Sequence, residues 1–528
     1  MCFDAGEETT VFYNPVQVQN RDLSVLMIAR YAERRKQEFV AKQEKLRLRK
    51  QAQDRTQPPT QDTSPASNDV FPGLDILDAL AASGLRSMRY WKECSPAKVI
   101  RHITVNDLDP AAHDRATRNV TSNDLPVATD RSMAGLRIQT ADATHVMYNS
   151  RQKRQKAASD NTEATQWDVI DLDPYGSAAP FLDGAVQAVV SGGLLNITCT
   201  DMAALGGSHP ETCFGRYLGA MPISRSSYLQ ELALRMLLYS VAMTAARYGR
   251  VIEPVLSVGM DFYVRVFVVV KDSKAGVNQL SLRTGQLYQS SLCPSFHVMP
   301  VGQMGGKKGT VYQPARLTIG STCAETGSPF KIAGPLWIGP LHNPEFVQDA
   351  LEALNCSDEA LFPHITTKGR LTGLLTSCLD ELNDVPLYYK LPDLSRAVHT
   401  SSMPLMAIKS AVVHAGYRVS GYHKDPDAIK TDAPDAVVWD IMRAWVKKQG
   451  RSPKIQDDSA AARILAREST IEVDFSVAPS VRESQANLNK VSRFPMNPEA
   501  NWGPKARATG VKRTATGSPK GADKNGGE

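Results

Sequence analysis

The stretch Val169-Ile170-Asp171-Leu172-Asp173-Pro174-Tyr175-Gly176 joins a short apolar run to a carboxylate, a proline and an aromatic ring. The apolar residues predict a buried strand, and a helix-like segment, residues 181–190, follows them. In a parallel sheet the carboxyl ends of the strands line the ligand crevice. Asp173 and the carbonyl of Pro174 can accept both protons of an exocyclic amine, while Tyr175 covers the ring of a planar base. An ordinary strand-to-turn junction is the alternative interpretation, because Asp-Pro and Tyr-Gly are common in turns.

Strand and helix patterns alternate on both sides of this stretch. The expected strands are residues 74–80, 99–105, 136–140, 168–172 and 193–198, and the expected helices begin at residue 85 or span 111–120, 181–190 and 228–248. Two more apolar runs, residues 251–258 and 263–270, are close enough in sequence to pair antiparallel. The alternation predicts an α/β fold with a doubly wound sheet. The final antiparallel pair is typical of a methyltransferase sheet rather than a dehydrogenase sheet.

Composition sets broad limits on the class of protein. A chain of 528 residues has room for two or three domains, and a net charge of +6 permits a nucleic-acid partner without requiring one. The eight cysteines are scattered without disulfide-scaffold spacing, which favours a reducing intracellular compartment. The acidic N-terminus has no signal-peptide core, and no apolar run reaches membrane-spanning length. We therefore expect a soluble protein with no membrane partner.

Changes in composition also suggest domain boundaries. We predict a sheet domain over residues 1–271, a smaller C-terminal α+β domain over residues 272–478, and a disordered basic tail over residues 479–528. Two polar, basic segments interrupt the first domain, and we expect loose insertions there, at about residues 36–69 and 150–165. We expect the first to begin as a solvated helix that runs into a disordered loop.

Acidic residues lie on or end several of the expected strands. Asp78 belongs to the first strand, Asp107 closes the second and Asp142 closes the third. Asp107 lies 107 − 84 = 23 residues after Gly84, close to the spacing at which an acid meets ribose hydroxyls. With Asp173, these acids predict one crevice for an adenosine ligand beside its substrate. A single strand-end acid can equally cap a helix. The loop before Gly84 is also a poor match to the glycine-rich nucleotide-binding motif, because Leu80 and Ala82 stand where glycines are expected.

Several motifs, in order along the chain, resemble those of the tRNA (guanine-26, N2)-dimethyltransferases. They are residues 12–23, 78–86, 106–107, 173–176, 200–201, 334–342 and 388–390, continuing to Arg396. The resemblance covers most of residues 11–475. It implies a class I, Rossmann-like methyltransferase domain followed by a smaller domain that contacts tRNA. It also implies transfer of one or two methyl groups from S-adenosyl-L-methionine to N2 of guanine 26 in tRNA.

The resemblance also implies roles for particular residues. The cofactor contacts it implies are Arg21, Arg86, Asp107, Asp142 and Ala143, to which the strand pattern adds Asp78. The base pocket it implies consists of Asp173, Pro174 and Tyr175. Scattered basic residues could contact tRNA, although a solvated face explains most of them equally well: Lys307, Lys308, Lys368, Arg370, Arg396, Lys409, Lys424, Lys447 and Lys448. We expect a monomer, with the nucleus favoured over the mitochondrion.

Two other functions stay open. A 5-methylcytosine RNA methyltransferase would use Cys199, at the end of the fifth strand, as its nucleophile. A catalytically silent tRNA-binding protein would keep the fold without needing the strand-end acids. For structural zinc, relatives often carry two Cys-x-x-Cys pairs. Here Ser290-Ser-Leu-Cys293 and Cys323-Ala-Glu-Thr326 keep one cysteine each, so we predict that no metal is bound.

Overall fold

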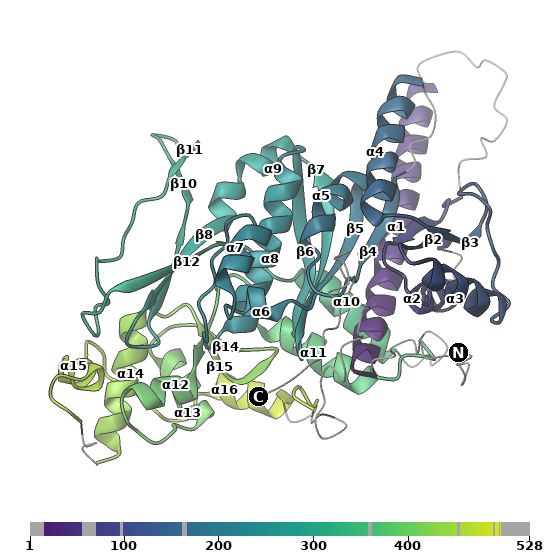
Figure 1. Cartoon of the computed structure of the whole chain (residues 1–528). Coiled ribbons are helices and arrows are strands. Elements are labelled where there is room, and N and C mark those ends of the chain that lie inside the picture. The colour runs from purple at the N-terminus through teal and green to yellow at the C-terminus, as the bar shows by residue number, and fades with distance from the viewer. Residues whose placement is uncertain are drawn as a thin grey trace, which may run out of the picture.

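The computed structural model describes residues 15–54, 70–94, 99–160, 166–356, 362–450, 455–488, 491–495 and 497. At its centre is a seven-stranded sheet in the order β3-β2-β1-β4-β5-β7-β6 (Figure 1). The strands are β1 (Leu74–Asp78), β2 (Ile100–Asp107), β3 (Gly135–Thr140), β4 (Trp167–Leu172), β5 (Val189–Cys199), β6 (Arg250–Met260) and β7 (Tyr263–Asp272). The first five are parallel, and β7 runs antiparallel to both β5 and β6, which confirms the predicted closing pair.

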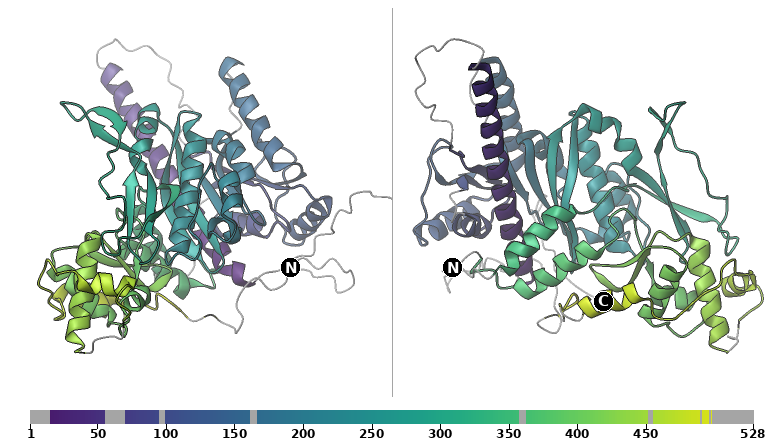
Figure 2. Two further views of the ribbon diagram at one scale, coloured as in Figure 1. Left: turned by 60° about the vertical axis from the view of Figure 1, so that its left-hand side comes forward. Right: turned by 180° about the vertical axis from the view of Figure 1, so that it is seen from behind.

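Helices cover both faces of this sheet, as a doubly wound fold requires. Helices α4 (Ala143–Asp160), α5 (Ala179–Ala188) and α8 (Leu229–Ala246) share one hydrophobic core with it. The other core contains α1 (Val18–Asp54), α2 (Leu85–Glu93), α3 (Pro110–Thr121), α10 (Pro344–Asn355) and α11 (Lys368–Asp380). Figure 2 shows α10 and α11 beside the first turns of α1. Elements beyond residue 271 therefore complete the packing of the sheet, and the predicted domain boundary stays a prediction.

Two predicted element boundaries are wrong. Helix α4 continues to Asp160, so residues 150–160 are helical rather than loose. Helix α1 continues to Asp54, which confirms the solvated helix expected at the start of the segment at residues 36–69. In α1 the reason is a run of strong helix formers (Lys, Arg, Gln, Glu, Ala and Leu), which holds a helix without burial. Residues 55–69 and 161–165 lie outside the described residues. Helix α5 ends at Ala188, because the β-branched Val189 and Val190 already belong to β5.

The C-terminal part is α+β, as predicted. Its strands are β8 (Thr284–Ser290), β9 (Phe296–Pro300), β10 (Gly302–Gly305), β11 (Val311–Pro314), β12 (Phe330–Trp337), β13 (Tyr389–Lys390), β14 (Val419–Tyr422) and β15 (Asp425–Thr431). They form sheets β12-β8-β9, β10-β11 and β13-β15-β14. Helices α12 (Leu391–Ala397), α13 (Leu405–His414), α14 (Asp435–Lys448), α15 (Ala460–Ala466) and α16 (Pro479–Leu488) lie around them. The core of this part is built around Trp439.

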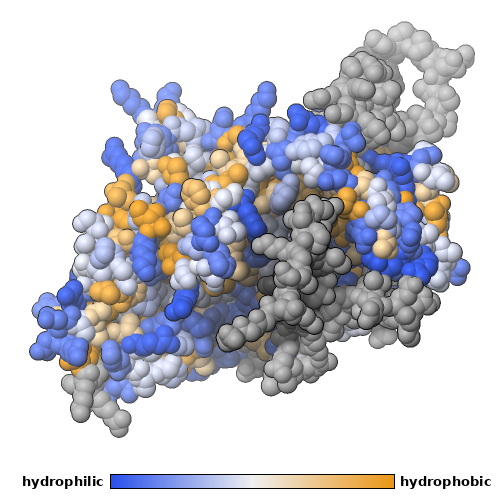
Figure 3. Space-filling view, in the orientation of Figure 1, coloured by the Kyte–Doolittle hydropathy of each residue, from blue (hydrophilic) through white to orange (hydrophobic). Residues whose placement is uncertain are grey.

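The predicted disordered tail begins too early in the chain. Residues 479–488 form α16, and the N–H of Ala478 just before it donates to Ser410 Oγ at 3.0 Å. Arg493 pairs with Asp380 on α11 at 2.5 Å. Residues 498–528 lie outside the described part of the chain. Within the described ranges, none of the helices combines the length and apolar character needed to cross a bilayer. Hydrophilic and apolar residues are interspersed over the face shown in Figure 3.

Candidate active site

Asp173 lies one residue beyond the end of β4, with 23% of its side chain exposed. Nη2 of Arg86, from α2, donates a hydrogen bond to Asp173 Oδ2. Burial alone would raise the pKa of Asp173, but the positive charges of Arg86 and Arg265 outweigh it and lower that pKa below its ordinary value. Asp173 is therefore an ionised acceptor at the carboxyl edge of the sheet.

The loop after Asp173 places an aromatic ring at the surface. Pro174 is buried, whereas Tyr175 is 83% exposed. The next residue, Gly176, has a φ of 87°, which disfavours any side chain there. Its N–H donates to Thr200 Oγ1 at 2.8 Å, and its carbonyl accepts from the N–H of Thr200 at 2.9 Å. Thr200, just beyond the end of β5, thus fixes the turn that presents Tyr175. Thr200 belongs to the motif at residues 200–201, which carries the family resemblance but had no predicted role.

Beneath Asp173 lies a buried charged network. Arg265 Nη2 contacts Asp171 Oδ1 at 3.0 Å and Ser24 Oγ at 2.9 Å, and Tyr90 donates to the other oxygen of Asp171. Ser24 Oγ also accepts from Arg86 Nη1 at 3.2 Å. Sequence reasoning missed Arg265, although a charged residue inside the apolar run of β7 was a usable signal.

Asp78 ends β1 and is 1% exposed. Its Oδ2 accepts a hydrogen bond from Ser87 Oγ at 2.7 Å. Burial, reinforced by the charge of Asp171, raises the pKa of Asp78 well above its ordinary value. A cation bound nearby would favour the charged form of such an acid. Asp78 is therefore suited to the neighbourhood of a positively charged ligand.

Asp107 at the end of β2 shapes the loop between β1 and α2. Its Oδ2 accepts the N–H of Ala82 at 2.8 Å, and its Oδ1 accepts the N–H of Asp109 at 3.0 Å. Ala82 has a φ of 49°, so this contact supports a strained turn. In the same loop a Cβ on Gly84 would lie 3.2 Å from Ala116 Cβ, so the glycine allows close approach of α3.

The remaining predicted cofactor residues lie at helix starts. Asp142 Oδ1 accepts the N–H groups of Thr144 at 2.7 Å and His145 at 3.3 Å. Burial works in the opposite direction, yet these bonds lower the pKa of Asp142. Ala143 is the first residue of α4 and is buried, while Arg21 is half-buried in the first turns of α1.

The fold thus brings the four predicted acids to one edge of the sheet. Asp78, Asp107, Asp142 and Asp173 lie at or just beyond the carboxyl ends of β1, β2, β3 and β4, which are four adjacent parallel strands. Each also accepts a hydrogen bond within the protein, and Asp142 in addition caps the first turn of α4. Their contacts with cofactor and base stay predictions.

Cys199 does not have the surroundings of a nucleophile. Its side chain is fully buried, and Tyr217 donates to its Sγ at 3.6 Å. Burial, followed by the charge of Asp201, raises the pKa of Cys199 to about 12. A catalytic thiol needs the opposite, a thiolate that substrate can reach. This geometry disfavours the 5-methylcytosine alternative.

The residues considered for tRNA contact differ in exposure. Arg396 pairs with Asp393 at 2.6 Å and Lys424 with Asp261 at 3.3 Å, so both already have acidic partners. Lys409 is half-buried, and burial, aided by Arg493, lowers its pKa. The exposed ones are Lys307, Lys308, Lys368, Arg396, Lys447 and Lys448.

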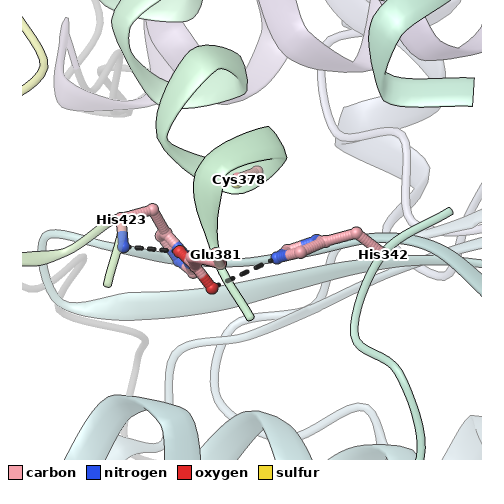
Figure 4. A group of neighbouring side chains, drawn as sticks. All are labelled: His342, Cys378, Glu381 and His423. Carbon is pink, nitrogen blue, oxygen red and sulfur yellow. Dashed lines mark hydrogen bonds and ion pairs between the residues drawn. The ribbon is translucent and has the colours of Figure 1, made fainter. Parts of the chain in front are cut away.

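A buried group of possible metal ligands lies beside β6, two strands beyond β5 in the large sheet. The ligand atoms of His342, Cys378, Glu381 and His423 are all within 4.8 Å of one another (Figure 4). Glu381 lies between the histidines, with Oε1 2.7 Å from His423 Nδ1 and Oε2 3.6 Å from His342 Nε2. This group was not found from the sequence, since its members lie far apart in the chain.

Hydrogen bonding in this group argues against a metal centre. The remote ring nitrogens accept backbone N–H groups of β6: His423 Nε2 from Gly259 at 2.9 Å, and His342 Nδ1 from Ser257 at 3.3 Å. A neutral imidazole accepts with one nitrogen and donates with the other, so the nitrogens facing Glu381 carry the protons. Metal-bound histidines show the reverse, donating from the remote nitrogen. The group instead covers β6, the edge strand of the large sheet.

Comparisons with known proteins show the family of this chain. The family model for N2,N2-dimethylguanosine tRNA methyltransferases matches residues 3–443. The chain is 37% identical over 513 residues to a tRNA (guanine(26)-N(2))-dimethyltransferase of Drosophila melanogaster, covering 94% of this chain and 84% of that protein. It is 39% identical over 519 residues to the Schizosaccharomyces pombe protein of the same name, covering 94% and 89%.

Two further similarities are relevant. The chain is 32% identical over 534 residues to the mitochondrial tRNA (guanine(26)-N(2))-dimethyltransferase of Saccharomyces cerevisiae, covering 95% of this chain and 90% of that protein. Among solved structures, Trm1 from Pyrococcus horikoshii, in complex with S-adenosyl-L-methionine, is 25% identical. Its TM-score is 0.60, and the match covers 84% of this chain and 96% of that chain.

Proposed function

The chain belongs to the N2,N2-dimethylguanosine tRNA methyltransferase family, and on this premise we propose that it methylates the exocyclic N2 of guanine 26 in tRNA, using S-adenosyl-L-methionine. The observation that carries the proposal is the pairing of an ionised Asp173 with an exposed Tyr175 at the edge where four strand-end acids converge. An acceptor for amine protons and a stacking surface for a base therefore adjoin a crevice suited to an adenosine ligand.

The residues present fit the cofactor. S-adenosyl-L-methionine supplies an electrophilic methyl group on a positively charged sulfur. Asp78, whose pKa burial raises, gains its charge most readily beside such a cation. Asp107 would hold the ribose hydroxyls and Asp142 the adenine amine, with Arg21 and Ala143 completing the contacts. Arg86, assigned to the cofactor by resemblance, also orients Asp173.

Asp173 and its neighbours would prepare the base for reaction. The lone pair of guanine N2 is delocalised into the ring, so this amine is a poor nucleophile. Hydrogen bonds from the amine to Asp173 and to the Pro174 carbonyl localise the lone pair on nitrogen and direct it at the methyl group. A nitrogen that has just gained a methyl group is a strong acid, so Asp173 can take its proton despite a lowered pKa. Tyr175 replaces the stacking that the base loses on leaving the tRNA helix.

Methyl transfer from labelled S-adenosyl-L-methionine to tRNA tests the function. We expect incorporation into a transcript with guanine at position 26 and none into its adenine-26 counterpart. Analysis of the digested product should yield N2-methylguanosine, N2,N2-dimethylguanosine or both. 5-Methylcytosine would instead favour the Cys199 alternative, and tRNA binding without incorporation would favour a silent binder.

We extend the proposal to assembly and location. We propose an intracellular monomer, because each site residue named above comes from a single chain. The nucleus is favoured over the mitochondrion on the basic residues 505–524, although the S. cerevisiae relative is named as mitochondrial. Size-exclusion chromatography with light scattering tests the first point, and imaging of a tagged full-length chain tests the second.

A further inference from the structure

Cys293 and Cys323 face each other inside the C-terminal part of the molecule. Their sulfur atoms are 3.6 Å apart, and the residues are 7% and 2% exposed. Cys293 follows β8 in the loop that leads to β9, and Cys323 lies in the turn before β12. Both belong to the core built around Trp439. The proposed methyltransferase site uses neither residue.

The two loops that carry these cysteines are held in place by hydrogen bonds. In the first, the N–H of Ser290 donates to the carbonyl of Ser295 at 2.9 Å. In the second, the N–H of Cys323 donates to the carbonyl of Ser328 at 2.8 Å. The N–H of Ser291 donates to the carbonyl of Pro329 at 3.2 Å and so joins the loops. These backbone bonds fix the two loops against each other and keep the two cysteines close.

The polar atoms around the two sulfurs are hydroxyls. Cys293 Sγ is 3.2 Å from Ser290 Oγ and 3.3 Å from Ser295 Oγ. Ser290 and Thr326 stand where a second cysteine would complete each Cys-x-x-Cys pair. Neutral hydroxyls are poor substitutes for the thiolate and imidazole ligands of structural zinc. What remains is one thiol per loop, positioned to react with the other.

The two sulfurs differ in acidity. The hydrogen bond between them lowers the pKa of Cys323, against the effect of burial, and raises the pKa of Cys293. Of the two thiols, Cys323 is therefore the one that loses its proton more readily. A thiolate beside a second thiol is the arrangement in which oxidation proceeds to a disulfide.

We infer that Cys293 and Cys323 form a modification site at which a peroxide produces a disulfide that ties the two loops together. Closing the bond brings the sulfurs together by about 1.5 Å, from contact distance to the usual S–S length. The Cys323 thiolate attacks the peroxide, so an S–O bond forms, the O–O bond breaks and hydroxide leaves. The sulfur of Cys293 then attacks Cys323, the S–O bond breaks, and the departing hydroxide takes the Cys293 proton as water. Two thiols and one hydrogen peroxide become one disulfide and two waters.

The cross-link would reinforce one side of the C-terminal part. The turn that carries Cys323 also carries Glu325, which is buried and pairs with Arg443 of α14 at 2.7 Å. The carbonyl of Thr326 in the same turn accepts from Arg463 of α15 at 2.9 Å. A bond to Cys293 connects this turn covalently to β8, and therefore links the three-stranded sheet to both helices.

The test compares reduced and peroxide-treated full-length protein in a Cys356→Ser background, which removes an exposed thiol. After free thiols are blocked under denaturing conditions, peptide mapping should find the two cysteine peptides joined and lighter by two hydrogens. The melting temperature of the oxidised protein should rise by about 5 °C and return on reduction. Cys293→Ser and Cys323→Ser should each abolish both effects, whereas Cys378→Ser should abolish neither.

Three results would overturn the inference. The first is that both thiols remain free after treatment that oxidises a control thiol peptide. The second is that the cross-linked peptide forms only when the protein is oxidised in denaturant. The third is one tightly bound zinc per chain in purified protein, because it would show that the two thiolates are metal ligands. None of these readouts depends on methyl transfer, so they are independent of the proposed function.

Discussion

Arg86 donates a hydrogen bond to Asp173, so a helix that follows β1 holds the carboxylate that follows β4. The guanidinium donates to one carboxylate oxygen, Oδ2. It also keeps Asp173 ionised, which a proton acceptor requires. The orientation of the proposed base acceptor therefore depends on a residue that the family resemblance assigns to the cofactor.

Replacing Asp173 should separate chemistry from cofactor binding. We expect Asp173→Asn to lower kcat by about 100-fold or more, because the amide offers one good acceptor where the carboxylate offers two. The Kd for S-adenosyl-L-methionine, measured by titration calorimetry, should change little. Turnover close to that of the unmodified enzyme would remove Asp173 from the proposed mechanism.

Thr200 offers a test of how the Tyr175 loop is positioned. Thr200→Val removes the oxygen that accepts the Gly176 N–H, and we expect kcat to fall between about 10-fold and 100-fold, the scale of a misplaced reactive group. Thr200→Ser keeps that oxygen and should restore most of the rate. Neither change should alter cofactor affinity. Equal rates for the two variants would mean that Thr200 only fills space.

A substitution of Asp107 tests its proposed contact with the cofactor. Asp107→Ala should weaken the binding of S-adenosyl-L-methionine by about 1–3 kcal/mol, the scale of hydrogen bonds to a charged acceptor. Because Asp107 also accepts the Ala82 N–H, the melting temperature of the free protein should be recorded in parallel. A lower melting temperature with an unchanged Kd would show that the residue supports the loop and does not touch the ribose.

The sequence predicts the strand-end acids well because each one lies within two residues of the end of an expected strand, and those strands are readable from local apolar residues. Asp107 and Asp142 needed only that rule. Arg265 could not be placed in the same way, since its role depends on strand register. It is the cross-strand partner of Thr198 once β7 pairs antiparallel with β5, and that pairing brings it beneath Asp173.

The predicted element boundaries are wrong where local sequence preference and tertiary packing favour different structures. The polar segment at residues 150–165 was interpreted as a loose insertion, yet residues 150–160 extend α4. The group around Glu381 is the opposite case. Its members come from residues 342, 378, 381 and 423, and only the packing of the C-terminal part against β6 brings them together.

That group should make the protein sensitive to acid. Burial lowers the pKa of His342 in the folded state, despite the opposing effect of Glu381. A histidine with a depressed pKa contributes stability above its unfolded pKa of about 6.5 and loses it as the pH falls, because only the unfolded chain then takes up the proton. The contribution of Glu381 to stability is also lost as the pH falls. Although burial opposes it, the contacts with both histidines lower its pKa, so its contribution is lost below its unfolded value of about 4.3.

We therefore expect the free energy of unfolding to fall between pH 7 and pH 5, with a slope of up to about 1.4 kcal/mol per pH unit from His342. His342→Asn keeps an acceptor for the Ser257 N–H but cannot titrate, so its profile should be flatter over this range, even if the variant is less stable overall. His364→Asn is the matched control, since that histidine is exposed. Urea unfolding at each pH measures the slopes. Parallel profiles for the protein and for His342→Asn would show that His342 takes up no proton on unfolding, and the tautomer assigned from the Ser257 contact would then be wrong.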